Sequence, residues 1–459
     1  MKSSVLVPLI VATALFMEQL DSAVLSTALP VIARDLGEDP IHLKLAVTSY
    51  LLSLAVFLPI SGWMADRFGA RIVFRIAMAV FMLGSVLCGL SDSMAGLIGS
   101  RIVQGMGGAM MTPVGRLIIL RSVSKAELVN ALMWLSIPAI LGPIMGPPIG
   151  GAIVTFLSWR WIFWLNIPIG VIGIIVATLY IPDMKGQPNL SFDAKGFLLV
   201  GVGLATFVTG TTTIGLQIFP IQFAAALLVV GVALLALFVW YSLRAEAPVL
   251  DLRLFGIPTF MLAILGGSLL RVAVGATPFL LPLLFQVAFG MSALDSGLLI
   301  FVAALGVLMS RFINARLLRR FGFRTVLISS TMFAAFFLGA PVIFTTATPL
   351  VLILFLLFMS GLTRSLSLSC VHALSFADVD ARRMSQATSI SAVAQQLSLS
   401  AGVTIGAVIL EISLGGRGGA NLVQADFLPA FIALTLIGLL AVPPYLKLDR
   451  KAGSEVSGH

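Results

Sequence analysis

Charged side chains are scarce in this chain. Only 10% of its 459 residues are Asp, Glu, Lys or Arg, whereas 59% are hydrophobic and the mean hydropathy is +1.10. A soluble domain needs a polar, charged surface, so this composition excludes one. The net charge of +9 therefore indicates membrane topology, because Lys and Arg gather on cytoplasmic loops, and we expect no nucleic-acid partner.

Cysteine is nearly absent, and several catalytic motifs are missing altogether. Cys88 and Cys370 both fall within apolar stretches, which argues against a disulfide framework or a metal site. The chain has no Gly-x4-Gly-Lys-Ser/Thr phosphate loop, no His-Glu-x-x-His, no Cys-x-x-Cys and no Gly-x-Ser-x-Gly. We therefore expect no enzyme, no cofactor, and no direct use of ATP as an energy source.

Long apolar stretches make up most of the sequence. About 18 apolar residues in a row are enough to cross a bilayer as a helix. Fourteen stretches of about this length or more fill almost the whole chain, at residues 5–30, 45–65, 73–91, 96–115, 131–156, 163–182, 196–216, 221–243, 258–284, 296–315, 325–345, 349–372, 385–411 and 426–446. The sequence predicts an all-α polytopic membrane protein. Lys and Arg lie mainly on one side if both termini are cytoplasmic, which sets that orientation.

One short motif occurs twice at corresponding places. Arg-Phe-Gly-x-Arg stands at 67–71, after the second stretch, and again at 320–324, after the tenth. A repeat at this distance predicts two parallel halves around a central path, which is a known plan of transporters. We assign a six-helix half to residues 1–182, a linker with two extra helices to 183–245, a second six-helix half to 246–447 and a cytoplasmic tail to 448–459.

Five longer motifs occur in order along the chain. They are Leu20 to Pro30; Gly62-x-x-Ala65-Asp66-Arg67-x-Gly69-x-Arg71; Arg101 to Ala109; Gly142-Pro143-x-x-Gly146-Pro147-x-x-Gly150-Gly151; and Trp159 to Gly170. With these motifs the chain resembles the major facilitator superfamily. Within it the chain is similar to the fourteen-helix drug:proton antiporters of the EmrB/QacA type, and most of all to their MdtD-like members.

The resemblance implies a proton-coupled exporter of small molecules that works by alternating access. Such a protein would act as a monomer in a bacterial cytoplasmic (inner) membrane, with protons, the lipid bilayer and a small-molecule substrate as partners. It also implies a set of gating residues, namely Asp66, Arg67, Gly69, Arg71, Gly142, Pro143, Gly146, Pro147 and Gly150. In the loop after the second stretch, Asp66 can pair with Arg71 or cap a nearby helix.

Two carboxyl groups lie in the middle of the first stretch. Glu18 and Asp21 are three residues apart, so both project to nearly the same face of a helix. A carboxylate within the membrane is costly unless it is paired, faces a cavity or takes up a proton. We therefore predict proton coupling at Asp21 and Glu18, together with Arg101, a position that the family resemblance associates with this role. The alternative is that an arginine simply neutralises the acids.

Substrate contacts are predicted at Asp21 and at four residues of the second half. Arg271 and Arg364 lie within apolar stretches, and the unusually polar thirteenth stretch carries Gln395 and Gln396. Two substrate classes remain open. Lipophilic, often cationic drugs suit the acids and an adaptable apolar cavity. An anionic metabolite or metal chelate, such as citrate or iron-citrate, suits the buried arginines. Alternatively, the arginines only neutralise Glu18, Asp21 or Glu411.

Overall fold

The computed structural model describes residues 3–123, 128–184, 186, 192–213, 221–246, 248–380, 383–417 and 422–449. Over these residues the chain is helical and contains no strand. Most of the predicted tail, residues 450–459, lies outside them. The principal helices are α1 (Ser3–Leu36), α2 (Lys44–Phe57), α3 (Ser61–Phe68), α4 (Ala70–Gly89), α5 (Met94–Ser122), α6 (Leu128–Phe156), α7 (Trp161–Trp164), α8 (Asn166–Tyr180), α9 (Ala194–Thr213), α10 (Ile221–Ser242), α11 (Pro258–Gly275), α12 (Thr277–Leu283), α13 (Ala293–Leu338), α14 (Leu350–Phe376), α15 (Met384–Arg417), α16 (Gln424–Leu439) and α17 (Val442–Leu446).

Twelve helical segments among the described residues are long and apolar enough to cross a membrane. They coincide with twelve of the fourteen predicted stretches. The other two stretches, 96–115 and 131–156, coincide with α5 and α6, which are each 29 residues long. Helix α5 is less apolar than these twelve segments, because it carries several glycines and polar side chains such as Arg101 and Gln104. Helix α5 thus differs from the twelve by the polar side chains that it carries inside the bundle.

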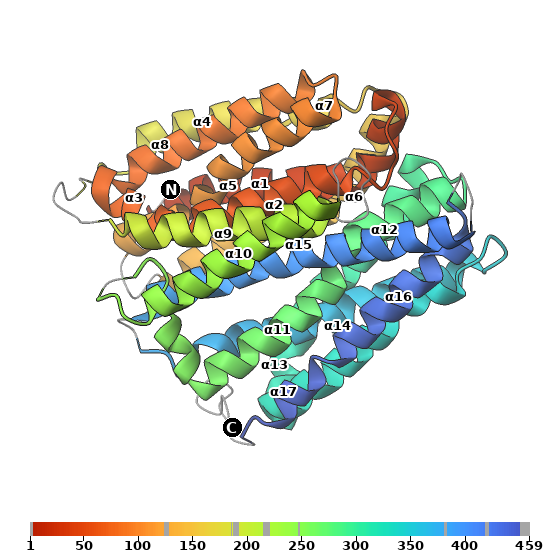
Figure 1. The fold of residues 1–459 in the computed structure, drawn as a ribbon. Helices are drawn as coiled ribbons and strands as arrows, with labels where there is room; N and C mark the ends of the chain where they lie inside the picture. Colours follow the sequence, from red (N-terminus) through yellow and green to blue (C-terminus); the bar gives the residue numbers. More distant parts are fainter. Residues whose placement is uncertain are drawn as a thin grey trace.

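The helices form two groups and an additional pair (Figure 1). In the N-terminal half, α1 packs against α5, α6 and α8, and α4 packs against α5 and α8. In the C-terminal half, α11 packs against α14, α15 and α16, and α13 packs against α14. The pair α9 and α10 connects the halves in sequence; α9 lies beside α2 and also reaches α15. The two halves meet where α2 contacts α15 and where α6 contacts α13.

The repeat seen in the sequence has a counterpart in the backbone. Four glycines have positive φ among the described residues: Gly37 at 67°, Gly69 at 94°, Gly290 at 68° and Gly322 at 75°. They form two pairs with the same separation in sequence, Gly37 with Gly290 and Gly69 with Gly322. The second pair belongs to the repeated Arg-Phe-Gly-x-Arg motif. Each half therefore makes the same two left-handed turns, which glycine adopts at low steric cost.

Contacts at one end of the bundle join the two halves. Lys44 Nζ of α2 lies 2.9 Å from Glu411 Oε1 of α15, and the Lys44 side chain is completely buried. Gln286 Nε2 donates a 2.8 Å hydrogen bond to the carbonyl oxygen of Thr27 on α1. Beside them, Gly151 of α6 packs against the backbone of α13 at Ala293. At this end, which is opposite the N-terminus, the halves are closed against each other.

The two repeated turns predict different costs for the same substitution. Gly69→Ala and Gly322→Ala both force a side chain into a left-handed conformation, which costs about 1–2 kcal/mol. At Gly69 the new Cβ would also collide with the carbonyl group of Met184, whereas nothing lies within 4 Å of it at Gly322. We expect both variants to melt at lower temperature, with Gly69→Ala clearly the worse, in thermal unfolding of the purified protein. Equal losses would contradict this packing.

The Lys44–Glu411 ion pair predicts a measurable change in how the halves separate. Glu411→Gln leaves Lys44 buried without its counter-charge. We therefore expect the population of the state that is closed at this end to fall about tenfold, a smaller change than loss of a fully buried pair would cause. Spin labels at Arg34→Cys and Ile412→Cys, with Cys88→Ala and Cys370→Ala, report the distance across this end. We expect a longer distance to gain population.

Asp92→Asn is the control for this measurement. Asp92 pairs with Arg160 within the N-terminal half, at 2.6 Å, so its loss should leave the distance between the halves unchanged. A distribution that responds equally to Asp92→Asn and Glu411→Gln would contradict a specific role of the inter-half pair.

Candidate functional site

A buried ion pair stands at the centre of the N-terminal half. Arg101 Nη1 of α5 lies 2.6 Å from Asp21 Oδ2 of α1, and both side chains are 1% exposed. Arg101 also donates to Gln104 Oε1 at 2.5 Å, and its guanidinium carbon lies 4.1 Å from the centre of the Tyr50 ring. A buried arginine needs a counter-charge and hydrogen-bond acceptors, and this arrangement supplies both.

Asp21 receives two further hydrogen bonds. Gln104 Nε2 and Asn166 Nδ2 each donate to Asp21 Oδ1 at 2.8 Å, and both amides also donate to Ser85 Oγ, at 2.7 and 3.1 Å. The network therefore draws on α1, α4, α5 and α8. Sequence analysis proposed Asp21 and Arg101 but did not assign Gln104 or Asn166, although both lie in the motifs Arg101–Ala109 and Trp159–Gly170. Uncharged amides in apolar stretches were the available signal.

Glu18 has a different environment from Asp21. It lies one helical turn away on α1 and receives a 2.9 Å hydrogen bond from Thr112 Oγ1 of α5. No ion pair to Glu18 is found among the described residues. Unlike Asp21, Glu18 lines a cavity. The two carboxyl groups looked equivalent in sequence but differ in their surroundings. Asp21 is held in a hydrogen-bond network, and Glu18 lines the cavity.

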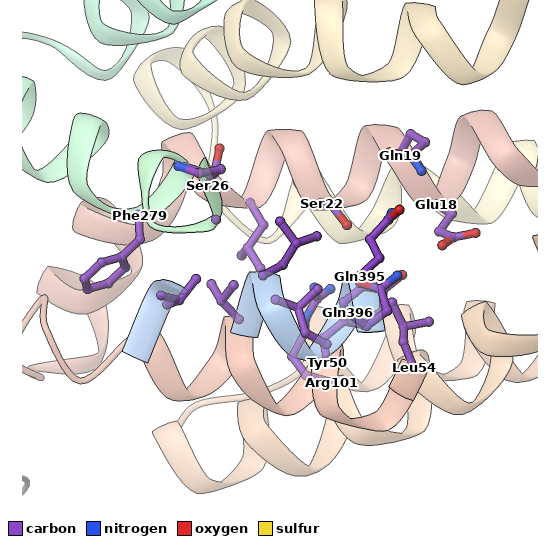
Figure 2. Close-up of a pocket in the computed structure, with 17 residues that line it drawn as sticks. Glu18, Gln19, Ser22, Ser26, Tyr50, Leu54, Arg101, Phe279, Gln395 and Gln396 are labelled. Atoms are coloured by element: carbon purple, nitrogen blue, oxygen red, sulfur yellow. The ribbon is translucent and has the colours of Figure 1, made fainter. Parts of the chain in front are cut away.

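The cavity has a volume of about 180 Å³ and lies between the halves (Figure 2). Helices α1, α2 and α5 line one side of it, and α11, α12 and α15 line the other. In Figure 2, Glu18 and Ser22 of α1 face Gln395 and Gln396 of α15. The full lining is Glu18, Gln19, Ser22, Leu25, Ser26, Val47, Tyr50, Leu51, Leu54, Arg101, Gly275, Pro278, Phe279, Gln395, Gln396, Leu399 and Val403.

The cavity combines an apolar wall with few charged groups. Among the described lining residues Glu18 is the only acid and Arg101 the only base. Because Arg101 is neutralised by Asp21, the uncompensated charge is that of Glu18. A largely apolar cavity with a few convergent polar groups is the usual form of a small-molecule site. The described residues contain no group of three or more His, Cys, Asp or Glu that could hold a metal ion.

Arg271 and Arg364 do not belong to this lining. Arg271 is 3% exposed, within the C-terminal half, and lies on α11 one turn before the lining residue Gly275. Arg364 is partly buried on α14. The structure thus brings Glu18, Gln395 and Gln396 together around the cavity, while the two arginines of the C-terminal half lie elsewhere. Their contact with a substrate stays a prediction.

The end of α3 and the turn into α4 make contacts within the N-terminal half. Asp66 Oδ1 lies 2.5 Å from Arg121 Nη2 of α5, with both side chains about two-fifths exposed. The expected partner was Arg71 or a helix N-terminus, and the structure shows Arg121 instead, because the end of α5 reaches this loop. Close to Gly69, the backbone of Gly186 packs against the carbonyl group of Arg67. Asp66 and Arg121 therefore link elements of the same half.

The glycines of α6 face α1. A Cβ at Gly142 would lie 2.8 Å from Gln19 Cβ, and one at Gly150 would lie 2.8 Å from the carbonyl oxygen of Val24. Gly146 would meet Ala23 in the same way. The absence of side chains lets the two helices approach closely, as in small-xxx-small packing. These contacts fix α1, the helix of Glu18 and Asp21, against α6, whose Gly151 touches the other half.

Comparisons with known proteins agree with this architecture. The family description Major Facilitator Superfamily matches residues 11–403 and 263–458. A relative from Serratia proteamaculans, named "Putative multidrug resistance protein MdtD", is 38% identical over 411 residues, which cover 87% of this chain and 84% of the relative. The protein of the same name from Escherichia coli (strain K12) is 35% identical over 445 residues, or 95% and 93% of the two chains.

Solved structures with low sequence identity share the fold. A D-xylose-proton symporter superimposes with a TM-score of 0.70 at 14% identity and covers 98% of both chains. A bacterial homolog of the human lysosomal transporter Spinster, inward-facing and unoccupied, gives 0.62 at 17% identity over 97% and 96%. With the family match over most of its length and these relatives, the chain belongs to the major facilitator superfamily, as an MdtD-like membrane transporter and not an enzyme.

Proposed function

We propose that this transporter is a drug:proton antiporter that exports lipophilic cations by alternating access. The observation that carries the proposal is the position of Glu18, the only carboxylate among the described residues that line the cavity between the halves. The relatives named for multidrug resistance support the substrate class. Antiport follows if the cation and the proton compete for the same carboxylate, because binding of one then releases the other.

Glu18 is better suited than Asp21 to exchange a proton with the cavity. Its single hydrogen bond from Thr112 leaves acceptor positions free. Asp21, in contrast, accepts from Arg101, Gln104 and Asn166 and is 3% exposed. A cation that binds at Glu18 needs no rearrangement of this network.

Asp21 and Arg101 take part in proton coupling indirectly, through the charge of Arg101 at the cavity. Arg101 belongs both to the Asp21 network and to the cavity lining. If Asp21 took up a proton, the guanidinium of Arg101 would lose its counter-charge and would repel a cation held at Glu18. The pair would therefore transmit protonation of Asp21 to the cavity, and Gln395 and Gln396 would contact the substrate from the opposite half.

The alternative substrate class, an anionic metabolite or chelate such as citrate or iron-citrate, is less well supported. The sequence argument for it counted Arg101, Arg271 and Arg364 against the acids. In the structure Arg101 is neutralised by Asp21, and Arg271 and Arg364 do not line the cavity. The remaining charge of the cavity is negative and favours a cation.

The proposal includes the topology expected from the sequence. Fourteen helices, with α5 and α6 as the fourth and fifth crossings, would place both termini in the cytoplasm of a bacterial cell whose inner membrane holds the protein as a monomer. Residues 1–182 and 246–447 would be the moving halves, joined by 183–245. The end closed by Lys44 and Glu411 would then face outwards. The gating set would act by holding α1 against α6 and α3 against α5.

The proposal predicts a specific loss of coupling in Glu18→Gln. In proteoliposomes with a trapped pH indicator, ethidium should drive proton movement with the wild-type protein. Removal of the exchangeable carboxyl should lower that signal by at least about tenfold, since general experience with single proton-transfer groups gives losses of this order or more. Glu38→Gln, an acid outside the cavity lining, should leave the signal unchanged.

Citrate, with and without iron, forms the second arm of the experiment, and Asp21→Asn joins both arms. Proton movement with citrate but none with ethidium would overturn the cation proposal and would favour the anionic class. Full ethidium coupling in Glu18→Gln would also contradict it. Loss of coupling in both Glu18→Gln and Asp21→Asn, with Glu38→Gln intact, is the result that the proposal expects.

A further inference from the structure

A buried arginine of the C-terminal half has no ion-pair partner among the described residues. Arg271 is 3% exposed, and its Nη1 atom is buried without a hydrogen bond. No carboxylate of the described residues forms an ion pair with Arg271, whereas Arg101 pairs with Asp21. A charge buried in this way is strongly unfavourable unless something compensates it. Arg271 therefore differs from Arg101, which has its counter-charge within the protein.

A second unpartnered donor lies beside Arg271. Tyr445 of α17 is 0% exposed, and its hydroxyl group also lacks a hydrogen-bond partner. The two side chains lie within electrostatic range of each other. Neither Arg271 Nη1 nor Tyr445 Oη hydrogen-bonds to another described residue.

Two neighbouring glycines of α11 make room for these side chains. A Cβ at Gly267 would lie 2.9 Å from Arg271 Nη1, and one at Gly266 would lie 2.8 Å from Tyr445 Oη. A side chain at Gly266 would collide first with the ring of Tyr445, and one at Gly267 would collide first with Val371 Cγ1. The guanidinium and the phenol thus lie over adjacent residues of one helix, in a cradle that depends on the missing side chains.

Two further basic residues lie near this site, one in each half. His372 of α14 lies within electrostatic range of Arg271 and also of Arg116 on α5 of the other half. Arg116 is exposed. Arg116 also lies within electrostatic range of Glu18, so the attraction for an anion at this place comes mainly from Arg271 itself.

We propose that Arg271 and Tyr445 form an anion-binding site in the C-terminal half, separate from the cavity at Glu18, which takes a carboxylate group. A guanidinium offers paired donors that match a carboxylate, and a phenol adds a third. The carboxylate comes either from a small free acid or from an acidic group of a transported molecule. The proposal does not require proton coupling or ethidium transport.

The position of Arg271 fits this division of roles. Its separation from Glu18 in sequence equals the separation of Gly69 from Gly322 and of Gly37 from Gly290. The two halves therefore present charges of opposite sign at the same place of the repeat, an acid in one and a base in the other. The acid suits a cation, and the base suits an anion.

The test uses benzoate as the probe and the full-length protein purified in detergent. At constant ionic strength, replacing chloride by benzoate should raise the melting temperature of the wild-type protein, because a ligand that binds the folded state stabilises it. Isothermal titration should give an affinity for benzoate that falls about tenfold or more in Arg271→Gln and roughly fivefold in Tyr445→Phe. Arg311→Gln, which removes an exposed charge of α13, should bind as the wild type does.

Arg271→Gln should fold, since it removes an unpaired buried charge; without benzoate its melting temperature should not fall below that of the wild type. A clear fall would overturn the proposal, because it would mean that the guanidinium is already compensated within the protein. The absence of any benzoate effect, or an effect that is equal in all variants, would also overturn it.

Counterflow of ciprofloxacin and of ethidium in proteoliposomes distinguishes the two sources of the carboxylate. If the acidic group belongs to the transported molecule, Arg271→Gln should slow ciprofloxacin and leave ethidium unchanged. If a free acid is the ligand, Arg271→Gln should change ciprofloxacin and ethidium counterflow to the same extent, and benzoate binding should still be lost. Failure of ethidium coupling with intact benzoate binding would count against the antiporter proposal alone.

Discussion

The ion pair between Arg101 and Asp21 is the contact on which the N-terminal half depends. A guanidinium buried among apolar helices is costly without a counter-charge and hydrogen-bond acceptors, and here Asp21 and Gln104 supply them, with the ring of Tyr50 beside the guanidinium. The network ties α1 to α5, and through Ser85 and Asn166 it reaches α4 and α8. Because it fixes the rotation of α1, it also determines that Glu18 faces the cavity.

Much of the fold could be predicted from sequence, because apolar runs, glycines and the repeated Arg-Phe-Gly-x-Arg motif are local signals. Twelve predicted stretches coincide with helices long and apolar enough to span a membrane, and the repeat reappears as paired turns at Gly69 and Gly322. The site was only partly predictable. Spacing places Glu18 and Asp21 on one face of a helix but cannot reveal that Arg101 comes from another helix to neutralise one of them. For the same reason Asp66 was expected to pair with Arg71 or to cap a nearby helix, whereas its ion-pair partner Arg121 lies at the far end of α5.

The two halves share a backbone plan but differ in their chemistry. Their paired positive-φ glycines show equivalent turns, yet Glu18 in the first half corresponds to Arg271 in the second. The first half neutralises its buried arginine internally, whereas the second leaves Arg271 and Tyr445 without partners. Contacts between the halves include the packing of α2 against α15 and of α6 against α13, together with Lys44–Glu411 and Gln286–Thr27. Two halves that meet along such an interface suit a transporter in which one half rocks against the other.

The central claim is that Glu18, and not Asp21, exchanges its proton with the cavity. Infrared difference spectroscopy of the purified protein during pH titration tests it most directly, since a protonated carboxyl group has its own C=O stretching band. The account predicts a band that grows as the pH falls, disappears on addition of ethidium, is absent in Glu18→Gln and persists in Asp21→Asn. A band that persists in Glu18→Gln and is lost in Asp21→Asn would contradict the account.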